Sequence, residues 1–442
     1  MSNQKSFRDH LDILQEEGLL LRIRAEVDPV FEAAALIKQA SKNNKAIYFE
    51  RLKGHDRPVV ANVAGSRNML SLALGMDESS FLPDFVSKSM NKYETRLVKK
   101  GPVQDVVEES SSFAKLPVLT YFEKDAGPYI TAGTVIAKDP ETGFRNSSYN
   151  RIMLKSSDLA GIRMMPPQHL GLIQLKAERK EKNLEVAIVI GNHPAEMIAS
   201  ASSLPFGEDH LNFASSLRGE RLETVKCQSV DIEVPAYSEL VIEGEIRANI
   251  RELEGPFGEF MDYYVPEGKN HVLKVKKITH RTDYLFQAML CGSAEDLGIL
   301  ALSRESLVYK SLKAAGYDVV DVSLMPFIFN GAVSIRKKFE GEPKNAMLCA
   351  FGAYSWLKYC VVVDDDVNVQ DLSDVWWAMA TRSQADKSVF TIPEALGFPR
   401  KDKWHMHRGK VGIDATVPLE LKPEFERKQI PGQDKVSLSK YS

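Results

Sequence analysis

Two glutamates, Glu254 and Glu259, lie in one short stretch in the middle of the chain, Arg251-Glu252-Leu253-Glu254-Gly255-Pro256-Phe257-Gly258-Glu259. A helix is disfavoured here, because proline lacks an N–H group and glycine loosens the backbone. We therefore predict a tight loop that aims both carboxylates into one cavity, with Phe257 packed beneath. Two close carboxylates repel when both are ionised, so one is driven toward its protonated form and can deliver or remove a proton. The alternative interpretation is a polar turn between two strands.

Two further motifs precede this loop, Asn146-Ser147-Ser148-Tyr149-Asn150-Arg151 and Met165-Pro166-Pro167-Gln168-His169. Together with the loop they resemble the UbiD family of decarboxylases, which use prenylated FMN. That family has an Asn-x-Ser-x-x-Arg segment, a Gln-His pair and a Glu-Gly-Pro-[Phe/Tyr]-Gly-[Glu/Asp] loop in this order. The resemblance covers nearly the whole chain, from Asp28-Pro29 to residues 410–416. Several motifs in the correct order are far more specific than any one of them.

The resemblance implies a chemistry for these residues. Removing CO2 from an unsaturated carbon leaves a carbanion that side chains cannot delocalise, so an electron-accepting cofactor is needed. In the family this cofactor is prenylated FMN, and a glutamic acid returns a proton to the substrate. Carried over by motif, the catalytic residues are Arg151, Glu254 and Glu259, with Glu259 as the proton donor. Arg151 would lower the pKa of Glu259 and Glu254 would raise it. Without the loop, Arg151 would be interpreted as a surface charge at a strand edge.

The same resemblance implies a flavin site with a metal at its phosphate. The cofactor-binding residues that it predicts are Asn146, Ser148, Tyr149, Asn150, Arg151, Gln168, His169, Ser202, Ser203, Leu204, Pro205 and Lys410. Amide, imidazole and carboxylate groups suit a divalent ion, and the expected ligands are Asn146, His169 and His210. His210 departs from the family, which has a glutamate at this position, so Glu208 or Asp209 is the alternative ligand. Manganese is the expected metal, and potassium is a further candidate ion.

The substrate prediction rests on Arg304, in Ala301-Leu302-Ser303-Arg304-Glu305-Ser306. In the family, the segment at this distance from the loop places a residue over the substrate ring. A buried cation here implies a second anionic group on the substrate, such as that of furan-2,5-dicarboxylate. Phenolic acids such as 4-hydroxybenzoate or protocatechuate are the alternative substrates, and a surface arginine paired with Glu305 or Asp296 is the structural alternative.

A non-catalytic flavin-binding protein on the same fold is the alternative of another class. Such a protein is expected to have lost one of the three catalytic residues, and none is missing here. We therefore predict that the protein is a lyase, a reversible non-oxidative decarboxylase of an aromatic, heteroaromatic or α,β-unsaturated acid. Its implied partners are the acid, CO2 and a flavin prenyltransferase that supplies the cofactor.

The elements that position these residues predict an α/β (α+β) multidomain protein. Helical spacing of apolar residues over 7–17 alternates with strand-like runs, which indicates an α/β domain over residues 1–110. Strand signals dominate residues 111–290, interrupted chiefly by a helix over 168–182. The resemblance implies that this part is a split β-barrel of the flavin-reductase type that binds prenylated FMN. The alternation returns in residues 291–442, a C-terminal α/β domain that we expect to form a homodimer or homohexamer.

Composition narrows the possible partners. The chain has 442 residues, 44% of them hydrophobic and 26% charged, with a net charge of −3. It has no basic stripe and no apolar run near the roughly 20 residues of a membrane span, so we expect neither nucleic acid nor membrane as partner, and a cytoplasmic location. Four scattered cysteines form no CxxC pair, so neither a zinc ribbon nor a disulfide framework is predicted.

Overall fold

The computed structural model describes residues 5–165, 168–398, 407–432 and 436. Pro166 and Pro167, within the predicted Gln-His segment, lie outside the described residues. The chain forms two compact units: the first holds the residues up to Ser306 and Met325–Ile328, and the second holds Leu307–Leu324 and those from Phe329 onward. The boundary falls inside helix α8 (Ala294–Ala314). No helix in the described ranges is long and apolar enough to cross a membrane.

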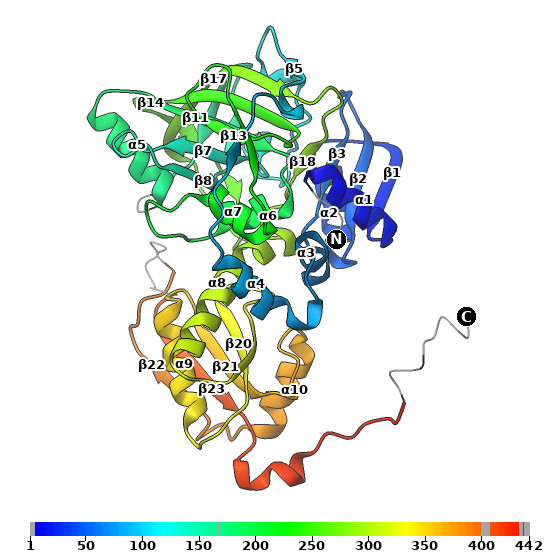
Figure 1. Ribbon diagram of the computed structural model, residues 1–442, viewed down its shortest axis with the longest axis vertical. Coiled ribbons are helices and arrows are strands. Elements are labelled where there is room, and N and C mark those ends of the chain that lie inside the picture. The colour runs from blue at the N-terminus through cyan, green and yellow to red at the C-terminus, as the bar shows by residue number, and fades with distance from the viewer. Residues whose placement is uncertain (1–4, 166–167, 399–406, 433–435, 437–442) are drawn as a thin grey trace. The chain divides into compact units, whose positions relative to one another are not determined.

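The first unit begins with a four-stranded sheet in the order β1-β2-β3-β18 (Figure 1). β1 pairs with β2 and β18 with β3 in parallel, whereas β2 and β3 are antiparallel. The strands are β1 (Leu20–Val27), β2 (Ala46–Leu52), β3 (Val59–Ala61) and β18 (Phe286–Ala288), and the helices are α1 (Phe7–Glu16), α2 (Glu32–Lys42), α3 (Arg67–Leu74), η1 (Glu78–Ser80) and α4 (Phe81–Ser89). The predicted helix over residues 7–17 is α1, whose start is fixed by a capping box of Ser6 and Asp9.

A larger sheet of the first unit curls into a half-barrel, as Figure 1 shows in green and cyan. Its strand order among the described residues is β6-β9-β10-β17-β14-β11-β7-β8, and β5 also pairs with β17. The central strands are buried on both faces: Val135, Ile188 and Ile242 belong to one hydrophobic core cluster, and the residues that alternate with them, such as Ile136 and Val241, belong to a second. The strands are β5 (Val106–Val107), β6 (Tyr129–Ile130), β7 (Thr134–Lys138), β8 (Arg145–Tyr149), β9 (Ile152–Leu154), β10 (Leu159–Ile162), β11 (Leu184–Ile190), β14 (Leu240–Glu254) and β17 (Gly268–His280).

Three helices pack against β8, which carries the Asn-x-Ser motif: α5 (His169–Arg179), α6 (Pro194–Ala201) and α7 (His210–Arg218). The predicted helix over 168–182 corresponds to α5. The smaller elements of this unit are β4 (Arg96–Leu97), β12 (Glu223–Lys226) and β13 (Glu233–Pro235), which form one sheet, β15 (Phe257–Gly258) and β16 (Tyr264–Val265), which form another, and the short helices η2 (Pro102–Gln104) and η3 (Phe113–Lys115).

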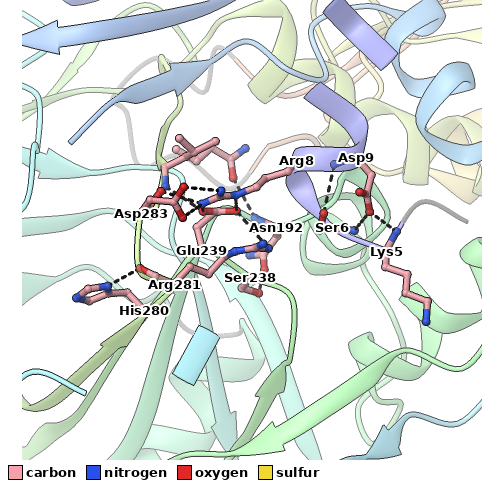
Figure 2. Close-up of polar contacts among 12 residues, drawn as sticks. Lys5, Ser6, Arg8, Asp9, Asn192, Ser238, Glu239, His280, Arg281 and Asp283 are labelled. Carbon is pink, nitrogen blue, oxygen red and sulfur yellow. Dashed lines mark hydrogen bonds and ion pairs between the residues drawn. The ribbon is translucent and has the colours of Figure 1, made fainter. Parts of the chain in front are cut away.

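An ion pair between the partly exposed Arg8 and the buried Glu239 ties helix α1 to the half-barrel. Arg8 donates from Nε and Nη2 to the two carboxylate oxygens of Glu239, at 2.9 and 2.8 Å, and from Nη1 to Asp283 (Figure 2). Glu239 is fully buried and also accepts the N–H of Leu285 at 2.9 Å. Removing one partner of such a pair leaves an uncompensated buried charge, so Arg8 fixes the N-terminal helix to the strand that leads toward the predicted loop.

The second unit is built on a five-stranded sheet in the order β19-β20-β21-β23-β22. β20, β21 and β23 are parallel, and the outer strands β19 and β22 are antiparallel to their neighbours. Helices α9 and α10 pack on β21 and β23. The elements are β19 (Val319–Ser323), β20 (Asn330–Ile335), α9 (Glu342–Ala353), β21 (Tyr359–Asp364), α10 (Leu372–Arg382), β22 (Val389–Ile392), β23 (Lys410–Ala415) and η4 (Leu419–Phe425).

Candidate active site

The loop predicted over residues 251–259 is shorter in the structure, because the first four of these residues belong to a strand. Arg251 to Glu254 still belong to strand β14 and pair with the beginning of β17. The chain leaves the strand at Gly255, whose φ of +95° only glycine adopts without strain. Glu254 is therefore the last residue of a long strand, and Glu259 follows the two-residue strand β15. The two glutamates leave the backbone from the two ends of a tight turn, as predicted.

Arg151 lies between the two glutamates. Its Nε and Nη2 donate to Oε1 and Oε2 of Glu254, each at 2.9 Å, and its Nη1 donates to Oε1 of Glu259. The guanidinium also lies over the ring of Phe257, 4.8 Å from its centroid, which is the packing expected for this phenylalanine. Because the Arg151 cation bonds both carboxylates, their mutual repulsion is offset. The three side chains form an ion triad, rather than the pair of repelling acids that the sequence predicted.

The two glutamates have different surroundings. Glu254 is fully buried and accepts two more hydrogen bonds, from the Tyr129 hydroxyl at 3.0 Å and the Asn270 amide at 2.8 Å. Burial and the charge of Glu254 raise the pKa of Tyr129, so this hydroxyl remains a donor. The side chain of Glu259 is 24% exposed. Of the pair, only Glu259 is placed to meet a small molecule.

The turn is held by a neighbouring segment that the sequence analysis did not identify. Asp125 accepts the N–H of Gly258 at 2.9 Å and that of Phe122 at 3.0 Å, and Ala126 donates its N–H to the Pro256 carbonyl at 3.0 Å. A Cβ at Gly258 would lie 2.4 Å from the Phe122 ring, so this position requires glycine. The glycine of the motif is explained by this close approach, whereas no local signal pointed to Asp125.

Arg163 is a second arginine at Glu259 that the sequence analysis missed. It follows β10, and its Nη1 lies 4.0 Å from Oε1 of Glu259. Its side chain is 25% exposed. Nothing in the sequence near Arg163 distinguishes it from a surface arginine; the pairing of β10 with β9 and β17 brings it to Glu259.

Two of the three predicted metal ligands, His169 and His210, lie near each other beside the strand that carries Asn146. Asn146 is buried on β8, and His169 and His210 are the first residues of α5 and α7. The two imidazole rings lie 6.3 Å apart between centroids. Burial lowers the pKa of His169 and lowers that of His210 to about 4, so both rings are neutral at pH 7, the form that binds metal.

His210 uses both of its ring nitrogens within the protein. Its Nδ1 accepts the N–H of Ser147 at 3.4 Å, and its Nε2 lies 3.3 Å from the Ser202 carbonyl. Coordination through Nε2 therefore requires the bond to Ser202 to be broken. Of the alternatives, Asp209 caps helix α7 and accepts Nε of Arg145 at 2.9 Å, whereas Glu208 is exposed. Asp209 is thus the alternative ligand that the geometry favours least.

No trio of His, Cys, Asp or Glu side chains in the described ranges is arranged as a metal site. The expected set contains only two such residues, since its third member is the amide of Asn146. Helix α5 adds a feature that suits an anion such as a phosphate. Within the described residues its N-cap, Gln168, makes no side-chain capping bond, and the first turn is the positive end of the helix.

The remaining predicted cofactor residues fall into three places. Ser148 bonds Asn150 at 2.9 Å, and the buried Tyr149 hydroxyl has no hydrogen-bond partner among the described residues. Ser202 ends helix α6, and Ser203, Leu204 and Pro205 follow it. Lys410 belongs to the second unit, where its ammonium donates to the carbonyls of Ser355 and Leu357, and burial lowers its pKa to about 8.

Arg304, the predicted substrate residue, contacts the segment that follows α6. Its guanidinium donates to the Ala201 carbonyl at 2.6 Å and to the Ser203 hydroxyl at 2.9 Å. It also donates to the Ser303 hydroxyl at 2.7 Å. Arg304 therefore lies beside the predicted flavin segment, which it helps to hold in place.

Comparison with family models matches three domains in order. They are the N-terminal domain, the Rift-related domain and the C-terminal domain of 3-octaprenyl-4-hydroxybenzoate carboxy-lyase, over residues 11–89, 96–294 and 298–415. An anhydromevalonate phosphate decarboxylase of Methanosarcina mazei is 35% identical over 434 residues, 96% of this chain and 99% of the relative. A phenolic acid decarboxylase of Sedimentibacter hydroxybenzoicus is 31% identical, covering 96% and 94% of the two chains.

Solved structures show the same similarity. The UbiD-class enzyme HmfF from Pelotomaculum thermopropionicum, in complex with FMN, matches with a TM-score of 0.93 and 41% identity, over 99% of this chain and 100% of that one. An evolved dimeric form of the same enzyme, in complex with prenylated FMN, matches with a TM-score of 0.90 and 39% identity, over the same shares of the two chains.

Proposed function

Because this chain belongs to the UbiD family of carboxy-lyases, we propose that it reversibly decarboxylates an aromatic, heteroaromatic or α,β-unsaturated acid with prenylated FMN. The observation that carries the proposal is the ion triad, in which Arg151 bonds a buried Glu254 and an accessible Glu259. HmfF, a similar structure, is described with FMN and prenylated FMN. The residues near α5, β8 and the end of α6 offer an uncapped helix N-terminus and polar groups that fit a flavin and its phosphate.

The residues of the triad have separate roles in the proposal. Prenylated FMN, when bound, supplies the electron-accepting group that a carbanion left by CO2 needs. Glu254, saturated by four donors, keeps Arg151 in one orientation. Arg151 in turn holds Oε1 of Glu259, which leaves Oε2 to carry the proton. Glu259 then donates this proton to the carbon that has lost CO2. Asp125 keeps the turn in place through Gly258.

We propose that the acid carries a second anionic group, held by Arg304. A furan-2,5-dicarboxylate-type diacid is our first candidate. The similarity to an anhydromevalonate phosphate decarboxylase is consistent with an acid of higher charge, because anhydromevalonate phosphate carries a phosphate besides its carboxylate. The alternative is a phenolic acid, which the Sedimentibacter relative favours. We also propose that a flavin prenyltransferase supplies the cofactor and that the protein assembles as a homodimer or homohexamer.

Anaerobic assay of the cofactor-loaded protein tests the substrate. The panel is furan-2,5-dicarboxylate, anhydromevalonate phosphate, 2-furoate, cinnamate, 4-hydroxybenzoate and protocatechuate. We expect Arg304→Ala to raise KM for the doubly charged acids by about tenfold or more, since an ionic hydrogen bond contributes roughly 1.5–3 kcal/mol. Turnover of a mono-acid should be spared, and Arg304→Lys should keep part of the effect. Flavin content is measured in each variant, because Arg304 also holds Ala201 and Ser203.

Two results would contradict the substrate assignment. One is a wild-type preference for cinnamate over every doubly charged acid. The other is unchanged diacid kinetics in Arg304→Ala with full flavin content. In either case a phenolic or simple aromatic acid becomes the better candidate.

We further propose a divalent metal, manganese first, at Asn146, His169 and His210, shared with the flavin phosphate. His169→Ala and His210→Ala should each weaken metal and flavin retention by about 10–100-fold or more, because even residues that only orient metal ligands contribute this much. Elemental analysis and flavin absorbance of the purified variants measure both. Glu208→Ala serves as the matched control and should retain metal and flavin. Loss of metal in Glu208→Ala but not in His210→Ala would transfer the third ligand position to Glu208.

A further inference from the structure

Arg163 is fixed in place by its backbone rather than by its charge. Its N–H donates to the Arg151 carbonyl at 3.4 Å, and its own carbonyl accepts the Asn150 amide at 3.0 Å. These bonds carry its side chain to the accessible face of the triad, where Nη1 lies 4.0 Å from Oε1 of Glu259. Both side chains are about one-quarter exposed, so a small molecule that reaches Glu259 also reaches Arg163.

The guanidinium of Arg163 makes few hydrogen bonds within the described residues. Its hydrogen-bond partner within the described part of the chain is the Met165 sulfur at 3.6 Å, a weak acceptor. The 4.0 Å approach to Glu259 is too long for a hydrogen bond. Arg151, in contrast, has Nε, Nη1 and Nη2 all on carboxylate oxygens. Two arginines therefore meet at Glu259, and in the part of the chain that the structure describes only Arg151 has its donors matched by carboxylate acceptors.

The net charge of Arg163 and its charged neighbours allows one more anion to bind. The charged side chains that face Arg163 are Arg151, Glu254 and Glu259. Two cations and two carboxylates cancel when both glutamates are ionised. When Glu259 carries the proton that it is to donate, the four groups together have one net positive charge. Burial and the neighbouring Arg151 also lower the pKa of Arg163, so a bound anion would stabilise this guanidinium.

We propose that Arg163 binds the carboxylate that the reaction removes. The inference rests on the proposed decarboxylation with Glu259 as proton donor. The donated proton takes the place of CO2 on the same carbon, so the departing carboxylate must lie beside Glu259. Within the described residues, Arg163 is the guanidinium at that place whose N–H groups are not matched by oxygen acceptors.

The electron and charge balance is consistent with this placement. The carbon–carboxyl bond breaks, its electron pair stays on the carbon, and CO2 leaves without charge. The proton of Glu259 then forms the new C–H bond, and Glu259 becomes an anion. One negative charge near Arg163 is replaced by another, so Arg163 does not have to lose its counter-charge as the reaction proceeds. In the reverse direction, the same N–H groups receive the newly formed carboxylate.

Binding to the FMN-loaded protein tests the proposal independently of turnover. Each acid is paired with its uncharged amide: 2-furoate with 2-furamide, benzoate with benzamide, and cinnamate with cinnamamide. Flavin absorbance reports the dissociation constants for the wild type, Arg163→Gln and Arg163→Lys. Arg179→Gln is the matched control, because Arg179 is exposed at the end of α5 in the same unit.

We expect Arg163→Gln to weaken acid binding by about tenfold or more, as loss of a charge-assisted hydrogen bond predicts. Amide binding should stay unchanged, Arg163→Lys should recover part of the loss, and Arg179→Gln should match the wild type. With prenylated FMN bound, KM should rise more than kcat falls. The proposal is overturned if the wild type binds no acid better than its amide, or if that preference survives in Arg163→Gln. Failure of the wild type to decarboxylate any acid would instead reject the proposed function.

Discussion

Replacing Glu259 by glutamine is expected to lower kcat by about 10²–10⁴-fold, the usual contribution of a general acid. The amide oxygen of glutamine can still accept the hydrogen bond from Arg151, so the turn and the flavin site should remain intact. What the variant cannot do is carry a transferable proton. Decarboxylation rate and flavin content are measured on the same anaerobic preparation.

Glu267→Gln is the matched control for this prediction. Glu267 is exposed on the segment that leads into β17, and the same change there should leave kcat at the wild-type value. Near-wild-type turnover in Glu259→Gln would remove Glu259 as the proton donor. A loss of flavin in parallel with the loss of turnover would show that the residue acts on the cofactor site rather than on proton transfer.

Arg151→Gln is expected to lower the free energy of unfolding by about 3–5 kcal/mol, the range for removing one partner of a buried ion pair. Glu254 is fully buried, and in this variant its charge would be left with Tyr129 and Asn270 as partners. Since a domain has only roughly 5–15 kcal/mol of stability, a reduced yield of folded protein is also expected. Urea denaturation followed by circular dichroism measures the change.

A double variant separates charge from packing. Arg151→Gln combined with Glu254→Gln removes both charges, so it should unfold at higher urea than Arg151→Gln alone. The two residues are in contact, and their effects should therefore be strongly non-additive. Additive losses would mean that Arg151 stabilises the protein through its contact with Phe257 rather than through Glu254. Arg179→Gln, at the exposed end of α5, controls for loss of an arginine charge.

The local features of this protein can be predicted from its residues. The capping residues Ser6 and Asp9 mark the start of α1, and Gly255-Pro256 ends the long strand β14. The order of the three motifs predicted the family, because the residue types and spacings that the chemistry needs occur within short segments of the sequence. The half-barrel was expected only through the family resemblance, since alternating apolar residues indicate strands but not how a sheet curls.

The burial and accessibility of these residues depend on the tertiary structure. Residue type does not distinguish Glu254 from Glu259, and only the family resemblance implied Glu259 as the proton donor. In the structure Glu254 is fully buried and Glu259 is 24% exposed, because Tyr129, Asn270 and Arg151 close around Glu254. Strand pairing brings Arg163 to Glu259 and makes it a candidate site residue. Asp125 contacts Gly258 from a loop more than a hundred residues earlier in the chain. Such contacts join segments far apart in the chain. Local residue patterns cannot encode them, because pairing and burial depend on which distant surfaces the fold brings together.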